Sequence, residues 1–227
     1  MFTSPLLPLV AGVALLAVVV APRADAQRSI QLPDPSLDGG VSIEETLGKR
    51  RSVREFSTAS LTLAQLGQLA WAAQGKTAAD GRRTAPSAGA RHPIEVLVVA
   101  SRVEGLAAGV YRYVSASHKL ARVAEGSRSL SGDLARAALG QSMLAEAPAV
   151  IVITGVEERT AGRYGARANR YVMIEAGCVA ENVSLQAVGL GLGTVLVGAF
   201  DDRRVSTLLN LDRGEQPILL MPVGRER

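Results

Sequence analysis

Residues 170–188 read RYVMIEAGCVAENVSLQAV, a stretch with the length and composition of a long helix. Its apolar residues cover a wide arc of that helix, and they are Tyr171, Val172, Ile174, Val179, Val183, Leu185 and Val188. Small residues, among them Ala176, Gly177 and Ala180, allow neighbouring elements to approach closely. We therefore expect a central helix that is buried nearly all round and that lies in a subunit interface.

Shorter elements are expected on either side of this helix. Ser42 with Glu45, and Thr62 with Gln65, have the spacing of capping boxes and predict two helix starts. The predicted helices span 42–49, 62–75, 130–139 and 201–209, and Asp201 or Asp202 caps the last of them. The predicted strands span 94–100, 109–114, 118–123, 149–154 and 217–223. Helices and strands alternate without regular βαβ spacing, so an α+β fold is favoured over a doubly wound sheet.

The composition is that of one globular domain. The chain has 227 residues, of which 48% are hydrophobic and 20% are charged, enough for a core of ordinary size. A single cysteine, Cys178, excludes an internal disulfide framework and a multi-cysteine metal site. With only His92 and His118 as histidines, we expect no metal site.

Arginine supplies most of the positive charge. The formal net charge is +4, and 22 of the 25 basic residues are arginines. A high-GC genome explains this bias as well as phosphate binding does. The basic residues stand in scattered pairs and aromatic residues make up only 4%, so nucleic-acid binding is not expected.

The first 26 residues predict a segment outside the fold. Residues 1–22 have no charged side chain, and the apolar run 6–21 precedes Ala24-Asp25-Ala26, the pattern of a signal-peptide cleavage site. We expect an exported, periplasmic protein with no stable membrane insertion after cleavage, and an uncleaved membrane anchor is the alternative. Residues 27–41 are rich in proline and glycine and predict an extended arm, followed by one domain over 42–227.

Three stretches have the residues of a ligand site. In RRSVR, residues 50–54, Arg50, Ser52 and Arg54 alternate, so an extended backbone places them on one side, where they can hold a phosphate and hydroxyl groups. PSAGAR, residues 86–91, allows backbone amides to approach a ligand. TVLVGAF, residues 194–200, ends in small residues whose amides can meet a flat ring. Taken singly, the first two are equally consistent with solvated loops. The third, taken singly, favours a plain core strand that ends in a turn.

Other motifs do not predict a site. GLGLG, residues 189–193, follows a helix, whereas a Rossmann fingerprint follows a strand and opens a helix. The sequence has no Walker A motif and no nucleophile elbow, and neither histidine is placed as the base of a triad. Cys178 lies within the long helix and is expected to be a buried, inert thiol.

Taken together, several short stretches resemble the nitroreductase family of flavoproteins, and more closely its branch of SagB-type dehydrogenases. These stretches are residues 50–56, 85–89, 109–113, 175–177 with Asn182, and 189–194. The resemblance covers residues 42 to 224. It implies an α+β nitroreductase-like fold, in which helices flank a central mixed or antiparallel sheet, and a homodimer with flavin mononucleotide (FMN) at the subunit interface.

The resemblance also implies which residues contact FMN. Arg50, Ser52 and Arg54 match the positions that hold the phosphate, the ribityl chain and the pyrimidine edge, and Arg51 or Arg54 supplies a cation near N1 and O2. Pro86, Ser87, Ala88, Gly89 and Arg91 match the loop that reaches FMN from the partner subunit. Gly198 and Ala199 match the backbone donors near N5, and Arg225 or Arg227 matches a C-terminal phosphate contact.

The implied activity is oxidation and reduction of a small-molecule substrate by hydride transfer through flavin N5, with ping-pong kinetics. Members of the branch that oxidise azolines use a Lys-Tyr pair, and the comparable residues here are Arg163 and Tyr164. Because arginine cannot act as a base near neutral pH, azoline oxidation is not expected. Tyr164 is a candidate proton donor, although a packing role is equally consistent with its position. NAD(P)H is not expected outside the cytoplasm, so oxygen or a quinone is a candidate acceptor.

Two other functions stay open. The first is an exported flavin- or nucleotide-binding module without turnover. The second is an arginine-rich protein that binds anionic polymers, which would be colourless and bind in a salt-dependent manner.

Overall fold

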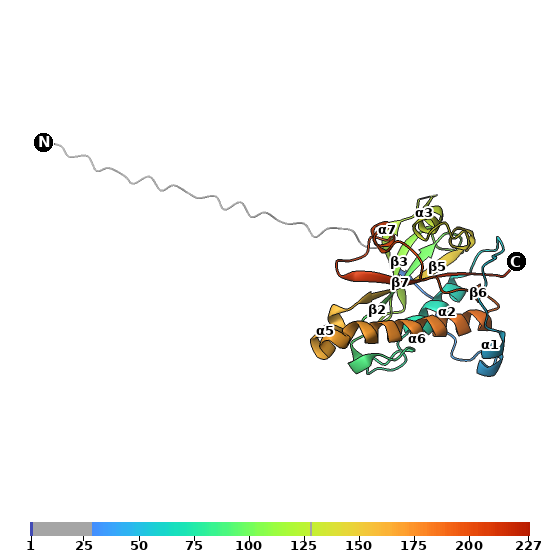
Figure 1. Ribbon diagram of the computed structural model, residues 1–227, viewed down its shortest axis with the longest axis horizontal. Helices are drawn as coiled ribbons and strands as arrows, with labels where there is room; N and C mark the ends of the chain where they lie inside the picture. Colours follow the sequence, from blue (N-terminus) through green and yellow to red (C-terminus); the bar gives the residue numbers. More distant parts are fainter. Residues whose placement is uncertain (2–28, 128) are drawn as a thin grey trace.

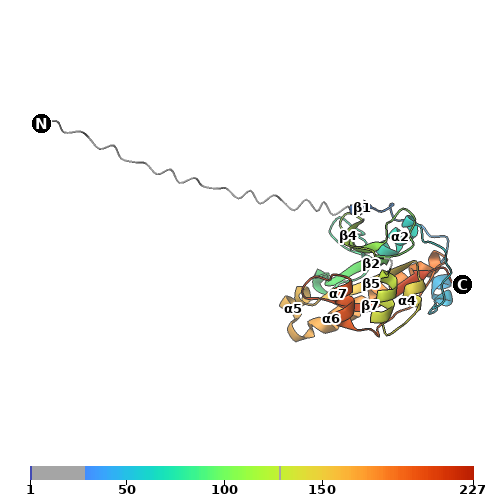
Figure 2. The same cartoon turned by 90° about the horizontal axis from the view of Figure 1, so that it is seen from above.

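The computed structural model of the chain describes Met1, residues 29–127 and residues 129–227. Its centre is a seven-stranded antiparallel sheet with the strand order β1-β4-β3-β2-β5-β7-β6. Figure 2 labels five of these strands, β1, β4, β2, β5 and β7, and they follow one another in this order. The strands are β1 (Ser29–Gln31), β2 (Ile94–Ala100), β3 (Gly109–Val114), β4 (Lys119–Glu125), β5 (Ala149–Val156), β6 (Gly193–Thr194) and β7 (Glu215–Gly224).

Helices cover both faces of the sheet, with α6 on one side and α3 and α7 on the other (Figure 1). The helices are α1 (Ile43–Lys49), α2 (Leu63–Gln74), α3 (Leu130–Ala137), α4 (Met143–Glu146), α5 (Glu158–Tyr164), α6 (Ala168–Gly189) and α7 (Asp202–Leu208), with 3-10 turns η1 (Ala88–Ala90) and η2 (Gly165–Arg167). The α+β fold class is therefore confirmed.

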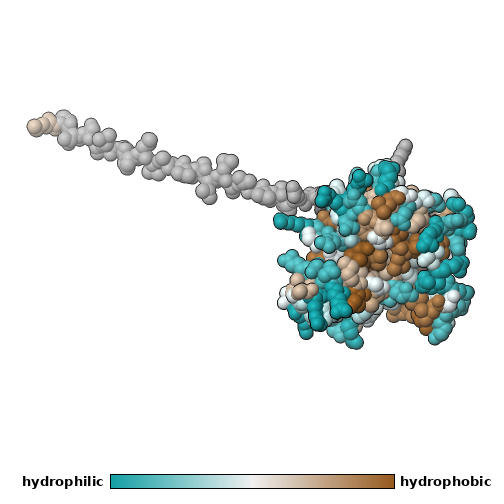
Figure 3. All heavy atoms as spheres, in the orientation of Figure 1, coloured by the Kyte–Doolittle hydropathy of each residue, from teal (hydrophilic) through white to brown (hydrophobic). Residues whose placement is uncertain are grey.

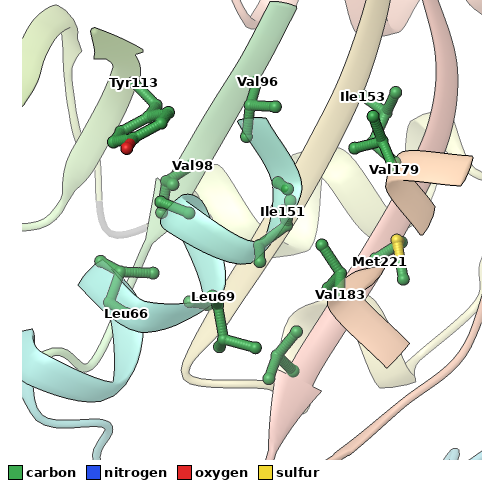
Figure 4. Close-up of a cluster of buried hydrophobic side chains, with 14 of the residues drawn as sticks. Leu66, Leu69, Val96, Val98, Tyr113, Ile151, Ile153, Val179, Val183 and Met221 are labelled. Carbon is green, nitrogen blue, oxygen red and sulfur yellow. The ribbon is translucent and has the colours of Figure 1, made fainter. Parts of the chain in front are cut away.

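The core has two halves, one on each face of the sheet. Ile151 and Ile153 of β5 pack with α2 and α6 (Figure 4), whereas the alternating Val150 and Val152 pack with α3, α4 and α7. Because β2 and β5 are covered on both faces, their sequences are apolar apart from Glu95 in β2 and Thr154 in β5. Each fully buried aliphatic side chain contributes about 1.5–3 kcal/mol of transfer free energy.

The predicted helix starts are confirmed with one correction. Thr62 and Gln65 form a complete capping box at the start of α2. Ser42 accepts a hydrogen bond from the Glu45 amide at the start of α1, but the Glu45 side chain does not return the bond. It pairs instead with Lys49, at 2.5 Å. The helix predicted over 130–139 ends two residues earlier, at Ala137, and the short helices α4 and α5 were not predicted.

The N-terminal arm takes part in the sheet. The sequence predicts an extended arm without an element between residues 27 and 40, but the structure places β1 there, and β1 pairs with β4. The His118 side chain ties the arm to the β3–β4 hairpin, because its Nε2 lies 2.9 Å from the Pro33 oxygen and its Nδ1 lies 2.9 Å from the Tyr113 hydroxyl. Burial raises the pKa of Tyr113 to about 12. The predicted signal segment falls on residues 1–26 and so lies, apart from Met1, outside the described residues.

One side of α6 is not buried within the single chain. Val172, Val179 and Val183 are buried against the sheet, but Met173 and Ile174 are exposed on the other side. The expectation of burial nearly all round is therefore wrong for one copy of the chain. Cys178 is half-buried and free, not fully buried as expected. Within the described part of the chain, no helix is both long enough and apolar enough to span a membrane.

Candidate functional site

Residues 50–54 run from the end of α1 along the edge of the sheet. The Val53 amide donates to the Thr194 carbonyl at 3.0 Å, and Ser52 forms a parallel bridge with Thr194. A Cβ on Gly193 would stand 2.6 Å from Val53, so only glycine allows this approach. The glycine-rich stretch 189–193 thus ends α6 and lets the arginine segment pack on β6, and it opens no helix.

The C-terminus joins the same edge. The Ser57 amide donates to the Arg225 carbonyl at 2.9 Å, and the Arg227 amide donates to the Glu55 carbonyl at 3.2 Å. Residues 50–57 and 225–227 are therefore neighbours, although they lie at opposite ends of the domain sequence. The structure brings together the two predicted phosphate-binding segments.

The arginines of this edge differ in what they contact. Among the described residues, the exposed side chains of Arg50, Ser52, Arg54 and Arg225 have no hydrogen-bond or ion-pair partner. Arg51 is engaged, because it pairs with Glu226 at 2.6 Å. The Arg227 guanidinium donates to the Phe56 carbonyl and lies 3.7 Å from Glu146. Of the two predicted C-terminal contacts, Arg225 is therefore the one whose side chain remains available.

A cavity of about 260 Å³ opens between this edge and the end of α6. Its lining includes Lys49, Arg51, Val188, Thr194 and Glu226. The Thr194 hydroxyl oxygen is buried without a hydrogen-bond partner. A cavity of this size is below the ~300–1,000 Å³ range of pockets that enclose a cofactor-sized ligand, so one chain alone does not complete such a pocket.

The segment after β6 presents two unpaired backbone amides. Gly198 and Ala199 are exposed, and within the described residues neither of their N–H groups donates a hydrogen bond. The Ala199 carbonyl, in contrast, accepts a bond from Gln141 at 2.9 Å. Gly198 lies four residues beyond Thr194, at most about 14 Å along an extended chain. Free amides and free guanidinium groups therefore lie along one edge of the molecule.

The loop at residues 86–91 lies at the other end of α6. The Ala88 amide donates to Glu175 Oε1 at 2.7 Å, and Ser87 Oγ accepts from the His92 amide at 2.8 Å. Gly89 has a φ of 59°, in the left-handed region that favours glycine. Pro86, Gly89, Ala90 and Arg91 are exposed, so the loop presents small residues and one cation to solvent.

Glu175 is the residue that holds this loop. Its side chain is 3% exposed, and its Oε2 is buried without a partner. Burial raises the pKa of Glu175, and the hydrogen bonds from Ala88 and Ser87 offset this rise only in part. An acidic residue in an otherwise apolar helical stretch is the signal that could have predicted this role, because a buried carboxyl group needs a hydrogen-bond partner.

Tyr164 lies beside the loop and not beside the arginine segment. Its hydroxyl is 2.9 Å from where a Cβ of Gly89 would stand, and its ring is 4.5 Å from that of Tyr171 between centroids. Arg163 lies over the Tyr164 ring at 5.6 Å. The predicted Arg163-Tyr164 pair is thus placed next to the predicted loop.

The two groups of predicted residues are separated within one chain. Glu175 contacts the loop, whereas Ser184 and Val188 line the cavity beside Arg51. Thirteen residues of helix between Glu175 and Val188 correspond to about 20 Å. The structure therefore brings together Arg50–Arg54, Gly198–Ala199 and Arg225 on one edge, and it places Pro86–Arg91 and Tyr164 apart from them.

A larger cavity, of about 400 Å³, lies elsewhere. It is formed by the arm, α1, α2 and the second half of α6, and its lining includes Val41, Ile43, Trp71 and Leu185. None of the predicted site residues lines it, although Asn182, part of a stretch that carried the resemblance, does. Asn182 donates to the carbonyls of Ala72 and Thr84, so it links α6 to α2 and the following loop.

Comparison with known proteins decides the family. The family model described as the nitroreductase family matches residues 47–225, which is most of the chain. The chain belongs to the nitroreductase family. The match includes the arginine segment, the loop at 86–91, α6 and the Gly198 segment, so the predicted resemblance is confirmed.

Individual relatives agree with this assignment. MJ1384 of Methanocaldococcus jannaschii, which has the name of a nitroreductase, is 45% identical over 197 residues, covering 87% of this chain and 96% of that protein. McbC of Escherichia coli, a microcin B17-processing protein, is 32% identical over 154 residues, covering 63% of this chain and 54% of that protein. A Ralstonia eutropha crystal structure, also named as a nitroreductase, has a TM-score of 0.76 at 32% identity, covering 88% of this chain and 90% of that one. As a member of this family, the protein is classed as an oxidoreductase.

Proposed function

We propose that this protein is an FMN-dependent oxidoreductase that works as a homodimer on a small-molecule substrate, by hydride transfer and with ping-pong kinetics. One observation carries the proposal: the unpaired guanidinium groups of Arg50, Arg54 and Arg225 lie along the same edge as the unpaired amides of Gly198 and Ala199. Guanidinium groups suit a phosphate, and free amides in a small-residue segment suit a flat ring. FMN has a phosphate at one end and such a ring at the other.

The exposed side of α6 supports the proposed homodimer. Met173 and Ile174 on α6, and Ile43 and Leu47 on α1, are exposed large hydrophobic residues. Figure 3 shows hydrophobic surface across the middle of the face that α6 crosses and at the corner near α1. Contiguous apolar surface of this kind typically marks an interface. Two α6 helices packed antiparallel about a two-fold axis would place the Pro86–Arg91 loop and Tyr164 of one subunit near the arginine segment of the other.

In this proposal the protein's own residues bind and orient the cofactor. When bound, FMN supplies the hydride chemistry, accepting and releasing a hydride at N5. Arg50, Ser52 and Arg225 hold the phosphate and ribityl end. The Gly198 and Ala199 amides donate to the ring near N5, and the Arg54 guanidinium favours negative charge at the pyrimidine edge. Donor and acceptor use the same open side in turn, which gives ping-pong kinetics.

The predicted location and the electron partners also remain proposals. With residues 1–26 as an export signal, the protein would act in the periplasm and pass electrons to oxygen or a quinone. Tyr164 is the proposed proton donor, since its hydroxyl lies beside the loop that would reach the partner's cofactor. Arg163 beside it does not act as a base, so we do not propose azoline oxidation.

The test is the visible absorption spectrum of the purified protein, before and after addition of FMN. We expect a flavin spectrum that a reductant bleaches and that oxygen or a nitroaromatic restores at a catalytic rate. The matched variant is Gly198→Phe. A Cβ there meets only Leu219, at 3.8 Å, so the protein should fold while the bulky ring blocks the flavin. Gly40→Phe, at an exposed glycine with no neighbour within 4 Å, is the control.

Each alternative gives a different result. A yellow protein without turnover would indicate a flavin-binding module. A protein that stays colourless after addition of FMN would overturn the proposal, and binding to anionic polymers that weakens with salt would then favour the arginine-rich alternative. Normal flavin content in Gly198→Phe would contradict the placement of the ring.

A further inference from the structure

A third cavity lies where β2 begins and β3 ends, which is one end of the sheet because the two strands pair antiparallel. Gln74, the last residue of α2, and Arg83 of the following segment also line it. Its volume of about 220 Å³ is below the ~300–1,000 Å³ of pockets that enclose larger ligands. Among the described residues, its lining includes none of the proposed flavin contacts. The cavity therefore suits a small molecule other than the flavin.

Side chains of the two strands divide between the two sides of the sheet. Ile94 and Val96 of β2 and Tyr113 of β3 are buried on the side of α2. Glu95 and Arg112 alternate with them and point to the other side, where they lie 3.5 Å apart. Each of the two has a further ion-pair partner, so their charges are compensated away from α2.

Arg83 is the cation on the α2 side of this cavity. Among the described residues, its half-buried guanidinium makes one hydrogen bond, from Nη1 to Gln74 Oε1 at 2.9 Å, and no ion pair. Burial lowers the pKa of Arg83, and the charge of Glu95 offsets this effect only in part. Because a guanidinium has five N–H donors, Arg83 keeps most of its binding capacity.

Gln74 adds a buried donor at the same place. Its side chain is only 3% exposed. Since a guanidinium can only donate, the amide oxygen of Gln74 faces Arg83, and the Nε2 group is left over. Within the described part of the chain this group has no hydrogen-bond partner, although buried amide groups normally have one. A charged donor and a neutral donor therefore border one small cavity.

We propose that this cavity binds a small carboxylate, with its oxygens on Arg83 and Gln74 and a short apolar body against Tyr113. A carboxylate matches the planar fork of arginine and supplies the negative charge that Arg83 lacks. The side chains of Ile94 and Val96 offer no hydrogen-bond donor, so the rest of the ligand is apolar. The inference does not rest on the proposed function, because it uses none of the proposed flavin contacts.

Calorimetric titration and thermal unfolding with sodium isobutyrate test this site in the purified protein. We expect a dissociation constant on the order of 1 mM and, at about 20 mM isobutyrate, a rise in Tm of about 5 °C. Isobutyramide has the same shape without the charge. This amide, and sodium chloride at equal ionic strength, should each raise Tm by less than about 1 °C, because neither supplies a carboxylate.

Three variants distinguish this site from a general effect of anions. Arg83→Gln removes the charge and should weaken isobutyrate binding at least about tenfold. Gln74→Glu keeps an acceptor for Arg83 and supplies the carboxylate from within the chain, so its Tm should no longer respond to isobutyrate. It also tests the site if Arg83→Gln does not fold. Arg82→Gln is the control, since it removes the neighbouring exposed arginine that pairs with Asp80, and it should bind normally.

Two results would overturn this site. The first is a natural protein whose Tm does not respond to isobutyrate, or responds equally to isobutyramide or to chloride. The second is unchanged isobutyrate binding in Arg83→Gln or in Gln74→Glu, because the ligand would then lie elsewhere. These measurements decide the carboxylate site whether or not the protein binds FMN, so a failure of the proposed function is recognised separately.

Discussion

Two groups of arginines in this protein have opposite surroundings. Arg112 on β3 is only 19% exposed, and it makes two hydrogen bonds to Glu215, at 2.7 and 3.0 Å, with Glu95 and Asp212 within 3.5 Å. Arg50 and Arg54 are exposed and have no partner among the described residues. The first arginine is neutralised within the fold, and the other two leave their charge available.

The difference shows how the same residue type serves stability in one place and a ligand in another. Burial alone would raise the pKa of Glu215, but the hydrogen bonds from Arg112 and Thr154 outweigh it and hold the pKa below its ordinary value. Such a pair has no capacity left for an external anion. Residues 50–54 are held by the backbone bond from Val53 to Thr194 and by the buried Val53 side chain, so the side chains of Arg50 and Arg54 are not needed for folding. Variants of Arg50 and Arg54 should therefore lose flavin affinity and keep their stability, whereas a variant of Arg112 should lose stability.

The largest effect is expected from the exposed group. Replacing Arg50 and Arg54 with Ala removes two charge-assisted contacts to the proposed phosphate and pyrimidine ends, each worth about 1.5–3 kcal/mol. FMN affinity should fall on the order of a thousandfold, while Tm of the flavin-free protein stays the same. Titration of flavin fluorescence measures the affinity. The double variant Arg82→Ala, Arg213→Ala loses the same charge at exposed turns and should bind normally, whereas full flavin occupancy without Arg50 and Arg54 would contradict the assignment.

A smaller effect, on stability, is expected from the buried group. Arg112→Met leaves the Glu215 carboxylate buried without its cation and should cost about 3 kcal/mol of unfolding free energy, lowering Tm by about 9 °C. Urea unfolding measures this loss. The exposed pair of Arg82 with Asp80 is the control, and Arg82→Met should cost less than about 1 kcal/mol. An Arg112→Met protein as stable as the natural one would show that the two groups do not differ as proposed.

The smallest effect concerns Glu175, a buried acid without an arginine. Because its pKa is raised, the folded protein holds this proton more tightly than the unfolded chain does. Its contribution to stability is complete below the ordinary glutamate pKa and is lost as the pH rises through the raised value. Glu175→Gln keeps an acceptor for the Ala88 amide and should remove this loss.

Thermal unfolding between pH 4 and 8 tests this expectation. Relative to Glu175→Gln, the natural protein should lose stability as the pH rises. Glu215 behaves in the opposite sense, because its lowered pKa makes its contribution complete above the ordinary range and lost as the pH falls through the lower value. Identical pH profiles of the natural protein and Glu175→Gln would show that Glu175 is charged in the fold like any exposed acid.

Local sequence patterns predicted most elements because their causes are local. The continuous apolar runs gave β2 and the buried part of β5, and the Thr62–Gln65 spacing gave the start of α2. Elements without such a pattern were missed, such as α5, or appeared where an irregular arm was expected, such as β1, which is formed only by pairing with β4. The alternation of Arg50, Ser52 and Arg54 predicted their common exposure, but no local pattern predicted that Arg51 pairs with Glu226, 175 positions away.

By itself, the sequence determined the fold class, the order of the main elements and the residue types available for binding, because burial periodicity and capping depend on neighbours within a few positions. Only the tertiary structure decided which of those residues share a surface. It joined the arginine segment to the C-terminus and to β6, placed the 86–91 loop on Glu175 about 20 Å away along α6, and joined the turn after α3 to Ala199 through Gln141. These contacts join residues far apart in the chain, and they form only when the helices and strands pack around one core.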